Sequence, residues 1–221
     1  MENFITLTID GVKVEVPAGT TVLEAAKKAG INIPTLCYLK DVNAIGACRM
    51  CVVNAGGRGL QAACVLPATD GMNVKTNTPE IRAYRKTLLE LVLSNHDKKC
   101  LTCPRSTNCE LQQLCRDLGV ENGDAFAGAQ NEYAIDDASP SIVRDNNKCI
   151  LCRRCVAACK QQLVSVIGAN DRGIDTHIAC AFELGLDDVP CVSCGQCINV
   201  CPTGALTERD DTAKVWAALA D

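Results

Sequence analysis

Eight of the seventeen cysteines of this 221-residue chain fall into two copies of one spacing, C-x2-C-x2-C-x3-C. In such a run, three thiolates wrap one face of a 4Fe-4S cubane, and the fourth is directed toward the neighbouring cluster. The first predicted ligand set is Cys149, Cys152, Cys155 and Cys201. The second is Cys191, Cys194, Cys197 and Cys159. This chemistry is the transfer of single electrons.

Two features bear on that interpretation. Pro202 follows Cys201, as the motif expects, but Lys160 follows Cys159 where a proline is usual. Zinc is the alternative metal, because it also takes four cysteines. Structural zinc sites are typically built from paired C-x2-C knuckles, so triplets with a trailing fourth cysteine favour iron–sulfur clusters.

Four earlier cysteines have the spacing C-x10-C-x2-C-x12-C and predict a 2Fe-2S cluster. They are Cys37, Cys48, Cys51 and Cys64. Plant-type ferredoxins have a first gap of four residues, so this is a variant with a longer loop.

Four unrelated buried thiols are the alternative, but the preceding segments favour the cluster. Alternating runs at 4–9 and 12–16 joined by Asp10-Gly11 predict a hairpin, and a helix over 23–29, capped by Thr20 or Thr21, follows. Hairpin, helix and cysteine loop is the order of a β-grasp ferredoxin.

A third ligand group combines a histidine with three cysteines. Thr78, Pro79 and Glu80 predict the start of a helix that runs to Leu93. The spacing H-x3-C-x2-C-x5-C follows it and predicts a third 4Fe-4S cluster, with ligands His96, Cys100, Cys103 and Cys109. Zinc with a Cys3His set remains an alternative for this group. The position between a 2Fe-2S region and a two-cubane region favours iron.

Composition narrows the class of protein. Aromatic residues make up 3 % of the chain, so the cysteine-rich stretches have little to bury, and we expect metal to supply much of their folding energy. The chain starts without a basic segment and long apolar run, and cysteines in metal spacings indicate a reducing compartment, so we expect a cytoplasmic protein. We expect no membrane span, since no run approaches about 18 apolar residues. A net charge of −4 argues against nucleic-acid binding.

The predicted fold is α+β with three metal-binding domains. Residues 1–78 form a β-grasp 2Fe-2S ferredoxin domain, and residues 79–119 form a small helical domain with the His/Cys3 4Fe-4S site. A linker over 120–141, rich in Gly, Asn and Asp, leads to a bacterial-type two-4Fe-4S ferredoxin domain over 142–210. Within the last domain, Val164-Ser165-Val166-Ile167 predicts a strand. A tail helix is expected over 211–221, where Trp216 serves as a packing or partner anchor.

Some residues fit none of these groups. Cys115 and Cys180 match no run, and we expect both to be small buried hydrophobic residues. Arg153 and Arg154 lie between ligands, where solvated surface charge is expected. The other interpretations are that they raise the potential of the adjacent cluster or dock an acidic partner. Gly56-Gly57-Arg58-Gly59 does not match a dinucleotide fingerprint. We therefore predict no catalytic residues and no cofactor beyond the cluster ligands.

The order of these ligand runs resembles the N-terminal iron–sulfur region of iron-only hydrogenases of the electron-bifurcating, NADH-linked type. It is also similar to the large iron–sulfur subunit of complex I and to the small diaphorase subunit of bidirectional hydrogenases. The resemblance covers residues 1–210. It implies a relay of one 2Fe-2S and three 4Fe-4S clusters, in a hetero-oligomeric complex, between a flavin-containing NAD(P)H dehydrogenase subunit and ferredoxin or another redox subunit.

Two alternatives stay open. Iron-only hydrogenases continue into a domain that holds the hydrogen-activating cluster, and nothing after Cys201 provides its ligands. The chain is therefore either a small electron-transfer subunit or the truncated relay portion of such a hydrogenase. An alternative of a different class is a zinc or iron–sulfur scaffold that serves folding or redox sensing.

Overall fold

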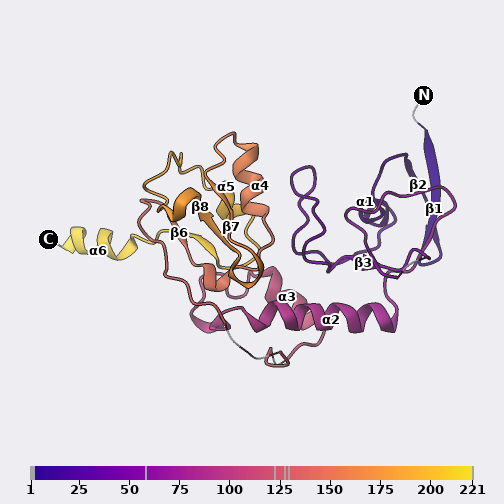
Figure 1. Cartoon of the computed structure of the whole chain (residues 1–221), viewed down its shortest axis with the longest axis horizontal. Helices are drawn as coiled ribbons and strands as arrows, with labels where there is room; N and C mark the ends of the chain where they lie inside the picture. The colour runs from indigo at the N-terminus through magenta and orange to yellow at the C-terminus, as the bar shows by residue number, and fades with distance from the viewer. Residues whose placement is uncertain (1–2, 58, 122, 127, 129, 221) are drawn as a thin grey trace. The chain divides into compact units, whose positions relative to one another are not determined.

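The computed structural model describes residues 3–57, 59–121, 123–126, 128 and 130–220, and Figure 1 traces the chain. The fold has two compact units, one comprising Met1–Asn95 and Glu110–Ala129 and the other His96–Cys109 and Gln130–Asp221. Residues 79–119, expected to be one domain, contribute to both units, and the domain limits stay a prediction. Within the predicted linker, residues 122, 127 and 129 lie outside the described residues. No helix in the described ranges is long and apolar enough to cross a membrane.

A three-stranded sheet of order β2-β1-β5 opens the first unit. β1 (Phe4–Ile9) and β2 (Val12–Pro17) form the predicted antiparallel hairpin. Asp10 and Gly11 both have positive φ, 49° and 91°, which is the backbone that a tight Asp-Gly hairpin turn requires. β5 (Asn73–Val74) pairs parallel with β1.

α1 (Val22–Lys28) covers this sheet, and Figure 1 draws it beside the hairpin. Thr21, one of the two predicted caps, accepts a hydrogen bond from the Glu24 N–H at 3.3 Å. The apolar side chains of α1 and of the alternating β1 and β2 positions form one buried core. Two short strands, β3 (Val52–Val53) and β4 (Gln61–Ala62), complete the β-grasp fold.

α2 (Pro79–Ser94) begins where the sequence predicted, with the Thr78 hydroxyl accepting from the Ile81 N–H at 3.2 Å. Its buried positions recur every four residues, so one stripe faces the unit: Ile81, Arg85, Leu89 and Leu93. α3 (Glu110–Asp117) buries Leu111 and Leu114 in the same unit.

The described part of the second unit contains two small antiparallel strand pairs, two short helices and a tail helix. β6 (Ile142–Arg144) pairs with β9 (Leu206–Glu208), and β7 (Ile167–Asn170) pairs with β8 (His177–Cys180). α4 (Arg154–Gln161) packs against α5 (Gln196–Asn199). Single 3₁₀ turns lie at Cys100–Thr102, Asn146–Lys148, Gly173–Asp175 and Ala181–Glu183. α6 (Thr212–Ala220) is the predicted tail helix.

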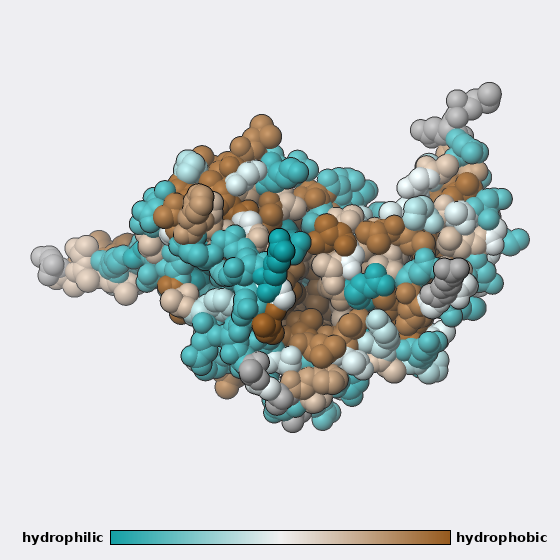
Figure 2. All heavy atoms as spheres, viewed as in Figure 1, coloured by the Kyte–Doolittle hydropathy of each residue, from teal (hydrophilic) through white to brown (hydrophobic). Residues whose placement is uncertain are grey.

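Two local expectations differ from the structure. The strand predicted at 164–167 begins only at Ile167, because Leu163 and Ser165 have φ values of 59° and 54° that a strand does not admit. Leu163 is 93 % exposed, and Figure 2 shows hydrophobic surface near α4.

Trp216 is 68 % exposed, so it does not serve as a packing residue within this unit, and a role as partner anchor stays a prediction.

Candidate metal centres

A pair of short strands gathers the four cysteines of the predicted 2Fe-2S site. β3 starts directly after Cys51, and β4 ends two residues before Cys64. The strands pair antiparallel, and the Ala63 N–H donates to the Cys51 carbonyl at 3.1 Å. Cys37 and Cys48 come from the preceding loop, where the Cys48 N–H donates to the Cys37 sulfur at 3.5 Å. Three of the thiols are buried and Cys48 is half-buried.

These four thiols interact directly. Hydrogen bonds from the thiols of Cys48 and Cys64 and from the Ala47 N–H lower the pKa of Cys37. Donating to Cys37 raises the pKa of Cys48 and of Cys64 in turn. A hydrogen bond from Cys64 lowers the pKa of Cys51. One negative charge is thus stabilised by its neighbours, and four thiolates need a cationic core to balance them. The donor set fits a 2Fe-2S cluster.

A buried arginine connects this loop to α2. The Nη2 atom of Arg85 donates to the Val52 carbonyl at 2.8 Å, one residue after the predicted ligand Cys51. Sequence reasoning missed this contact, since Arg85 occupies one of the buried positions of a helix that otherwise carries apolar residues there. The contact holds the metal loop on the helix.

His96 has the environment of a metal ligand. It is 8 % exposed, and its buried Nδ1 atom has no hydrogen-bond partner among the residues that the structure describes. Desolvation lowers the pKa of the ring, which favours the neutral imidazole that metals bind. An unsatisfied buried nitrogen is costly unless something binds it. The predicted companions Cys100, Cys103 and Cys109 are half-buried in the same unit.

The loop that carries this group touches the loop after Cys201. Arg105 donates from Nη2 to the Cys201 carbonyl at 2.9 Å, and the Cys109 thiol donates to the Pro202 carbonyl at 3.6 Å. Gly204 lies against Cys103 so closely that a Cβ at Gly204 would stand 2.6 Å from the sulfur. Two predicted ligand groups are therefore in direct contact within the second unit.

The two C-x2-C-x2-C-x3-C runs surround two separate cavities. Cys149, Cys152, Cys155 and Cys201 line one of them, together with Arg144 and Ile178. The other is lined by Cys159, Cys191, Cys194 and Cys197, together with Leu186 and Val192. In each case these are the four cysteines assigned to one cubane from spacing, with the fourth drawn from the other run. Cys194 is exposed, whereas the other cysteines of the described chain are buried or half-buried.

The two runs also repeat their backbone. Leu151 and Ser193, each directly before the second cysteine of its run, have φ values of 53° and 52°. Arg153 and Gly195, directly after that cysteine, have φ values of 59° and 70°. Left-handed backbone at non-glycine residues is unfavourable and persists where a site requires it. It curls the loop, and the Leu151 N–H donates to the Cys149 sulfur at 3.4 Å.

Spacing of the sulfurs separates clusters from single metal ions. Zinc holds thiolates at about 2.3 Å in a tetrahedron, which places its sulfurs about 3.8 Å apart. Among the described residues, no three of the predicted cysteine and histidine ligands lie within 4.8 Å of one another. The predicted ligands of the described residues are therefore not arranged as a closed tetrahedral zinc site.

Four residues that are not predicted ligands differ in their burial. Arg154 is buried, so the expectation of solvated surface charge is wrong for it, whereas Arg153 is exposed as expected. Cys180 is fully buried, as expected, but Cys115 is only half-buried. The sequence offers no signal that separates two adjacent arginines.

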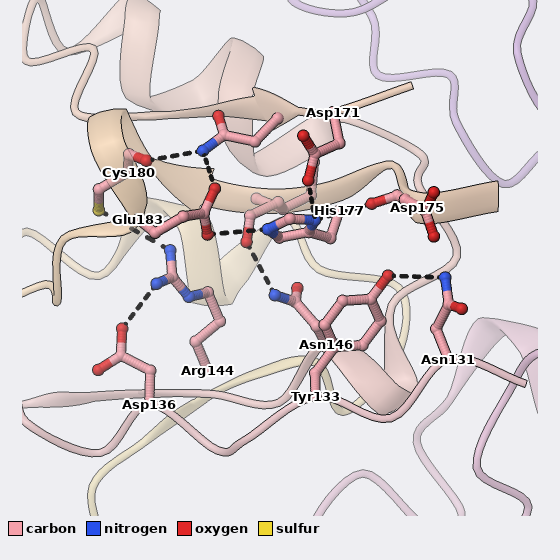
Figure 3. A network of polar contacts seen from close by, with 12 residues as sticks. Asn131, Tyr133, Asp136, Arg144, Asn146, Asp171, Asp175, His177, Cys180 and Glu183 are labelled. Carbon is pink, nitrogen blue, oxygen red and sulfur yellow. Dashed lines mark hydrogen bonds and ion pairs between the residues drawn. The ribbon is translucent and has the colours of Figure 1, made fainter. Parts of the chain in front are cut away.

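A polar network centred on His177 of β8 draws side chains from the turns before and after that strand (Figure 3). His177 Nδ1 lies 2.8 Å from the Asp175 carbonyl and 3.8 Å from Asp171 Oδ2, while Nε2 lies 2.9 Å from Glu183 Oε2. These contacts raise the pKa of His177, first through the Asp175 carbonyl and then through Glu183. Since the two carboxylates face opposite ring nitrogens, the arrangement favours a protonated imidazole over one shared metal ion.

Comparison with known families matches three segments. Residues 2–79 match a 2Fe-2S iron–sulfur cluster binding domain, residues 85–124 match the NADH-ubiquinone oxidoreductase-G iron–sulfur binding region, and residues 148–205 match a 4Fe-4S dicluster domain. The chain therefore carries 2Fe-2S-binding and 4Fe-4S-binding domains, and their helix and strand content confirms the predicted α+β fold.

Whole-chain comparison identifies the family. The gamma chain of the NAD-reducing hydrogenase HoxS from Cupriavidus necator is 31 % identical over 93 % of this chain and 87 % of its own length. A solved NAD+-reducing [NiFe]-hydrogenase chain, in the H2-reduced state, aligns with a TM-score of 0.88 at 33 % identity, covering 93 % of this chain and 87 % of its own. The chain belongs to the family of these hydrogenase iron–sulfur proteins.

Longer proteins are related as well. The NADP-reducing hydrogenase subunit HndD of Solidesulfovibrio fructosivorans is 45 % identical over 99 % of this chain. The alpha chain of the NADPH-Fe(3+) oxidoreductase of Geobacter sulfurreducens is 35 % identical over 93 % of this chain. The chain spans 38 % and 24 % of these two proteins, respectively. The family resemblance inferred from the ligand runs is confirmed.

Proposed function

We propose that this chain relays single electrons through one 2Fe-2S and three 4Fe-4S clusters. One-electron transfer is the chemistry that such clusters supply when bound. The chain's own residues hold them: Cys37, Cys48, Cys51 and Cys64 for the 2Fe-2S core, and His96 with Cys100, Cys103 and Cys109 for one cubane. The remaining two cubanes take the ligand sets that line the two cavities of the dicluster region.

The observation that carries this proposal is the pair of cavities, each lined by four cysteines drawn from both runs. The contact of Arg105 with the Cys201 carbonyl supports a relay further, because it brings the loop of the His96 group against one of the cubane loops. Electron tunnelling falls steeply with distance, so adjacent cluster loops are what a relay requires.

The family relationship supports a proposal for the partners. The gamma chain of HoxS is part of an NAD-reducing hydrogenase, by its name. By analogy, we propose that this chain works in a hetero-oligomer, between a flavin-containing NAD(P)H dehydrogenase subunit and ferredoxin or another redox subunit. The exposed Cys194 marks one place where an electron can enter or leave the described chain.

A second candidate is the relay portion of an iron-only hydrogenase. The relationship to HndD supports a portion of a longer hydrogenase chain, because this chain is 45 % identical to HndD over 99 % of its own length and spans 38 % of HndD. The length of the open reading frame distinguishes the two candidates, because a hydrogenase would continue into further ligand-bearing sequence.

Metal analysis of anaerobically purified protein tests the relay. About fourteen irons per chain, from one 2Fe-2S and three 4Fe-4S clusters, and a broad visible absorption that dithionite bleaches are expected. Electron paramagnetic resonance should then show a 2Fe-2S signal and several 4Fe-4S signals after reduction. A colourless protein that contains zinc would refute the relay and favour the scaffold alternative. Flavin in a copurifying polypeptide is the expected sign of the dehydrogenase partner.

A further inference from the structure

Arg144 is a buried cation at the wall of one predicted cubane site. It ends β6 and lines the cavity of Cys149, Cys152, Cys155 and Cys201. Its side chain is 8 % exposed. A guanidinium keeps its charge at any ordinary pH, so the cavity carries a permanent positive charge in a poorly solvated place.

Two contacts fix the position of this charge (Figure 3). Nη2 of Arg144 donates to Asp136 Oδ2 at 2.8 Å, and Nη1 donates to the Cys180 sulfur at 3.8 Å. The backbone of Asp136 is fixed as well. Its N–H donates to the Arg144 carbonyl, and its carbonyl accepts from the Arg144 N–H, both at 2.9 Å. Desolvation raises the pKa of Cys180, which keeps that thiol neutral. Asp136 is therefore the anion that directly opposes Arg144.

Reduction adds one negative charge to a cluster. A nearby fixed cation stabilises the reduced state and raises the reduction potential, whereas an anion lowers it, and both effects are strong where water is excluded. Arg144 and Asp136 thus act in opposite directions on the same cavity.

A neighbouring arginine provides the contrast. Arg153 lines the same cavity with the same charge, but its side chain is exposed. Water and salt screen such a charge, so it should influence the cluster far less.

We propose that Arg144 tunes the reduction potential of the cubane held by Cys149, Cys152, Cys155 and Cys201, and that Asp136 limits the size of its effect. The proposal rests on the proposed relay function. Within it, Arg144 acts as a positioning charge and does not bind the cluster.

The test is a potentiometric titration of the iron-loaded full chain, followed by electron paramagnetic resonance. The signal of this cubane is the one that Cys155→Ser alters. At the wild-type midpoint potential, Arg144→Gln should lower the ratio of reduced to oxidised cubane about tenfold, which is about 59 mV for one electron. Asp136→Asn should raise the same ratio, and Arg144→Lys should stay close to wild type.

Arg153→Gln is the matched control, with an expected change of less than about twofold, because screening weakens an exposed charge. The signal of the 2Fe-2S cluster should not move in any variant. Equal shifts for Arg144→Gln and Arg153→Gln, or shifts of the same sign for Arg144→Gln and Asp136→Asn, would overturn the proposal. If the Arg144→Gln variant loses iron, the Asp136→Asn variant provides the test. An unchanged ratio of reduced to oxidised cubane in Asp136→Asn would then overturn the proposal. Wild-type iron content and spectra test the relay itself, so the two failures are distinguishable.

Discussion

The two units of the molecule have cores of different residue composition. In the first unit the core is an apolar cluster that runs from Leu7 and Ile9 of the hairpin to Leu23 of α1, and Cys51 and Cys64 are a small minority of its buried residues. In the second unit, Cys155, Cys180 and Cys201 belong to the core itself, and four more cysteines pack against it. Its paired strands are only three or four residues long.

This difference indicates where each unit obtains its stability. A sheet covered by an amphipathic helix buries enough apolar surface to fold by the hydrophobic effect. A core in which three of nine buried residues are cysteines, two of them predicted ligands, has less of that contribution, and we expect metal binding to become part of its folding free energy. We therefore expect the first unit to support its metal loop and the second unit to depend on metal.

Removal of iron should separate the two units most clearly. After treatment of the full chain with a chelator and a thiol reductant, amides of β1, β2 and α1 should remain protected from hydrogen exchange. Amides of α4, β7 and β8 should exchange freely, because no cluster ties their core together. Equal protection, or equal loss, in both sets of amides would contradict the distinction.

A core substitution in the first unit should have the next largest effect. Leu23→Ala deletes a fully buried side chain of α1 and should lower the free energy of unfolding of this unit by about 2–5 kcal/mol. Denaturant titration followed through the 2Fe-2S absorption measures it. Leu163→Ala, which removes a side chain that is 93 % exposed, is the control and should change little. Similar effects of both substitutions would argue that metal, not the apolar core, holds this unit.

Gly204→Ala tests the packing of the metal loops in the second unit. The added methyl group would stand 2.6 Å from the Cys103 sulfur, so the loop must shift, at about 1–3 kcal/mol. We expect less iron per chain and an altered signal from the His96 group. Gly168→Ala adds the same methyl group where nothing lies within 4 Å, and it should retain full iron content. Normal iron and spectra in Gly204→Ala would show that the loops are not in contact.

Loss of a helix cap should have a smaller effect. Thr78→Ala removes the hydroxyl that accepts from the Ile81 N–H, at about 1 kcal/mol of stability. Thermal unfolding measures the change, and Thr78→Ser, which keeps the hydroxyl, should stay near wild type. An equal loss for the serine variant would assign the effect to the methyl group instead.

The smallest expected effect depends on pH. Because hydrogen bonding raises the pKa of His177 above its ordinary value of 6.5, its stabilising contribution is complete below that value and is lost as pH rises through the raised pKa. Glu183 is exposed, so the effect should be below about 1 kcal/mol. Local hydrogen exchange of Ile178–Cys180, measured at pH 5.5 and 8, should be faster at the higher pH after correction for intrinsic rates. His177→Gln should lose this pH dependence.

Local signals made much of this molecule predictable from sequence. The Asp10-Gly11 turn, the Thr78 cap and the cysteine spacings each express geometry over a few residues. The prediction of a strand at 164–167 was wrong, because nothing in the amino-acid sequence indicates the left-handed backbone of Ser165. The sequence also gives no indication that Arg154 is buried while the adjacent Arg153 is exposed.

The place of Arg144 could not be read from sequence, because tertiary pairing sets it. Arg144 reaches a cavity wall only through the pairing of β6 with β9, whose residues lie more than sixty positions away. Local spacing therefore predicts the ligands. It does not predict the side chains around them, because their positions depend on long-range contacts.

The exposure of Cys194 has a consequence for handling the isolated chain. A small oxidant dissolved in the buffer can collide with that sulfur without any segment moving aside. Dioxygen should therefore damage the cubane proposed at Cys194 before it reaches the shielded sites. Work in air would then yield a partly degraded protein whose remaining colour comes from the deeper centres.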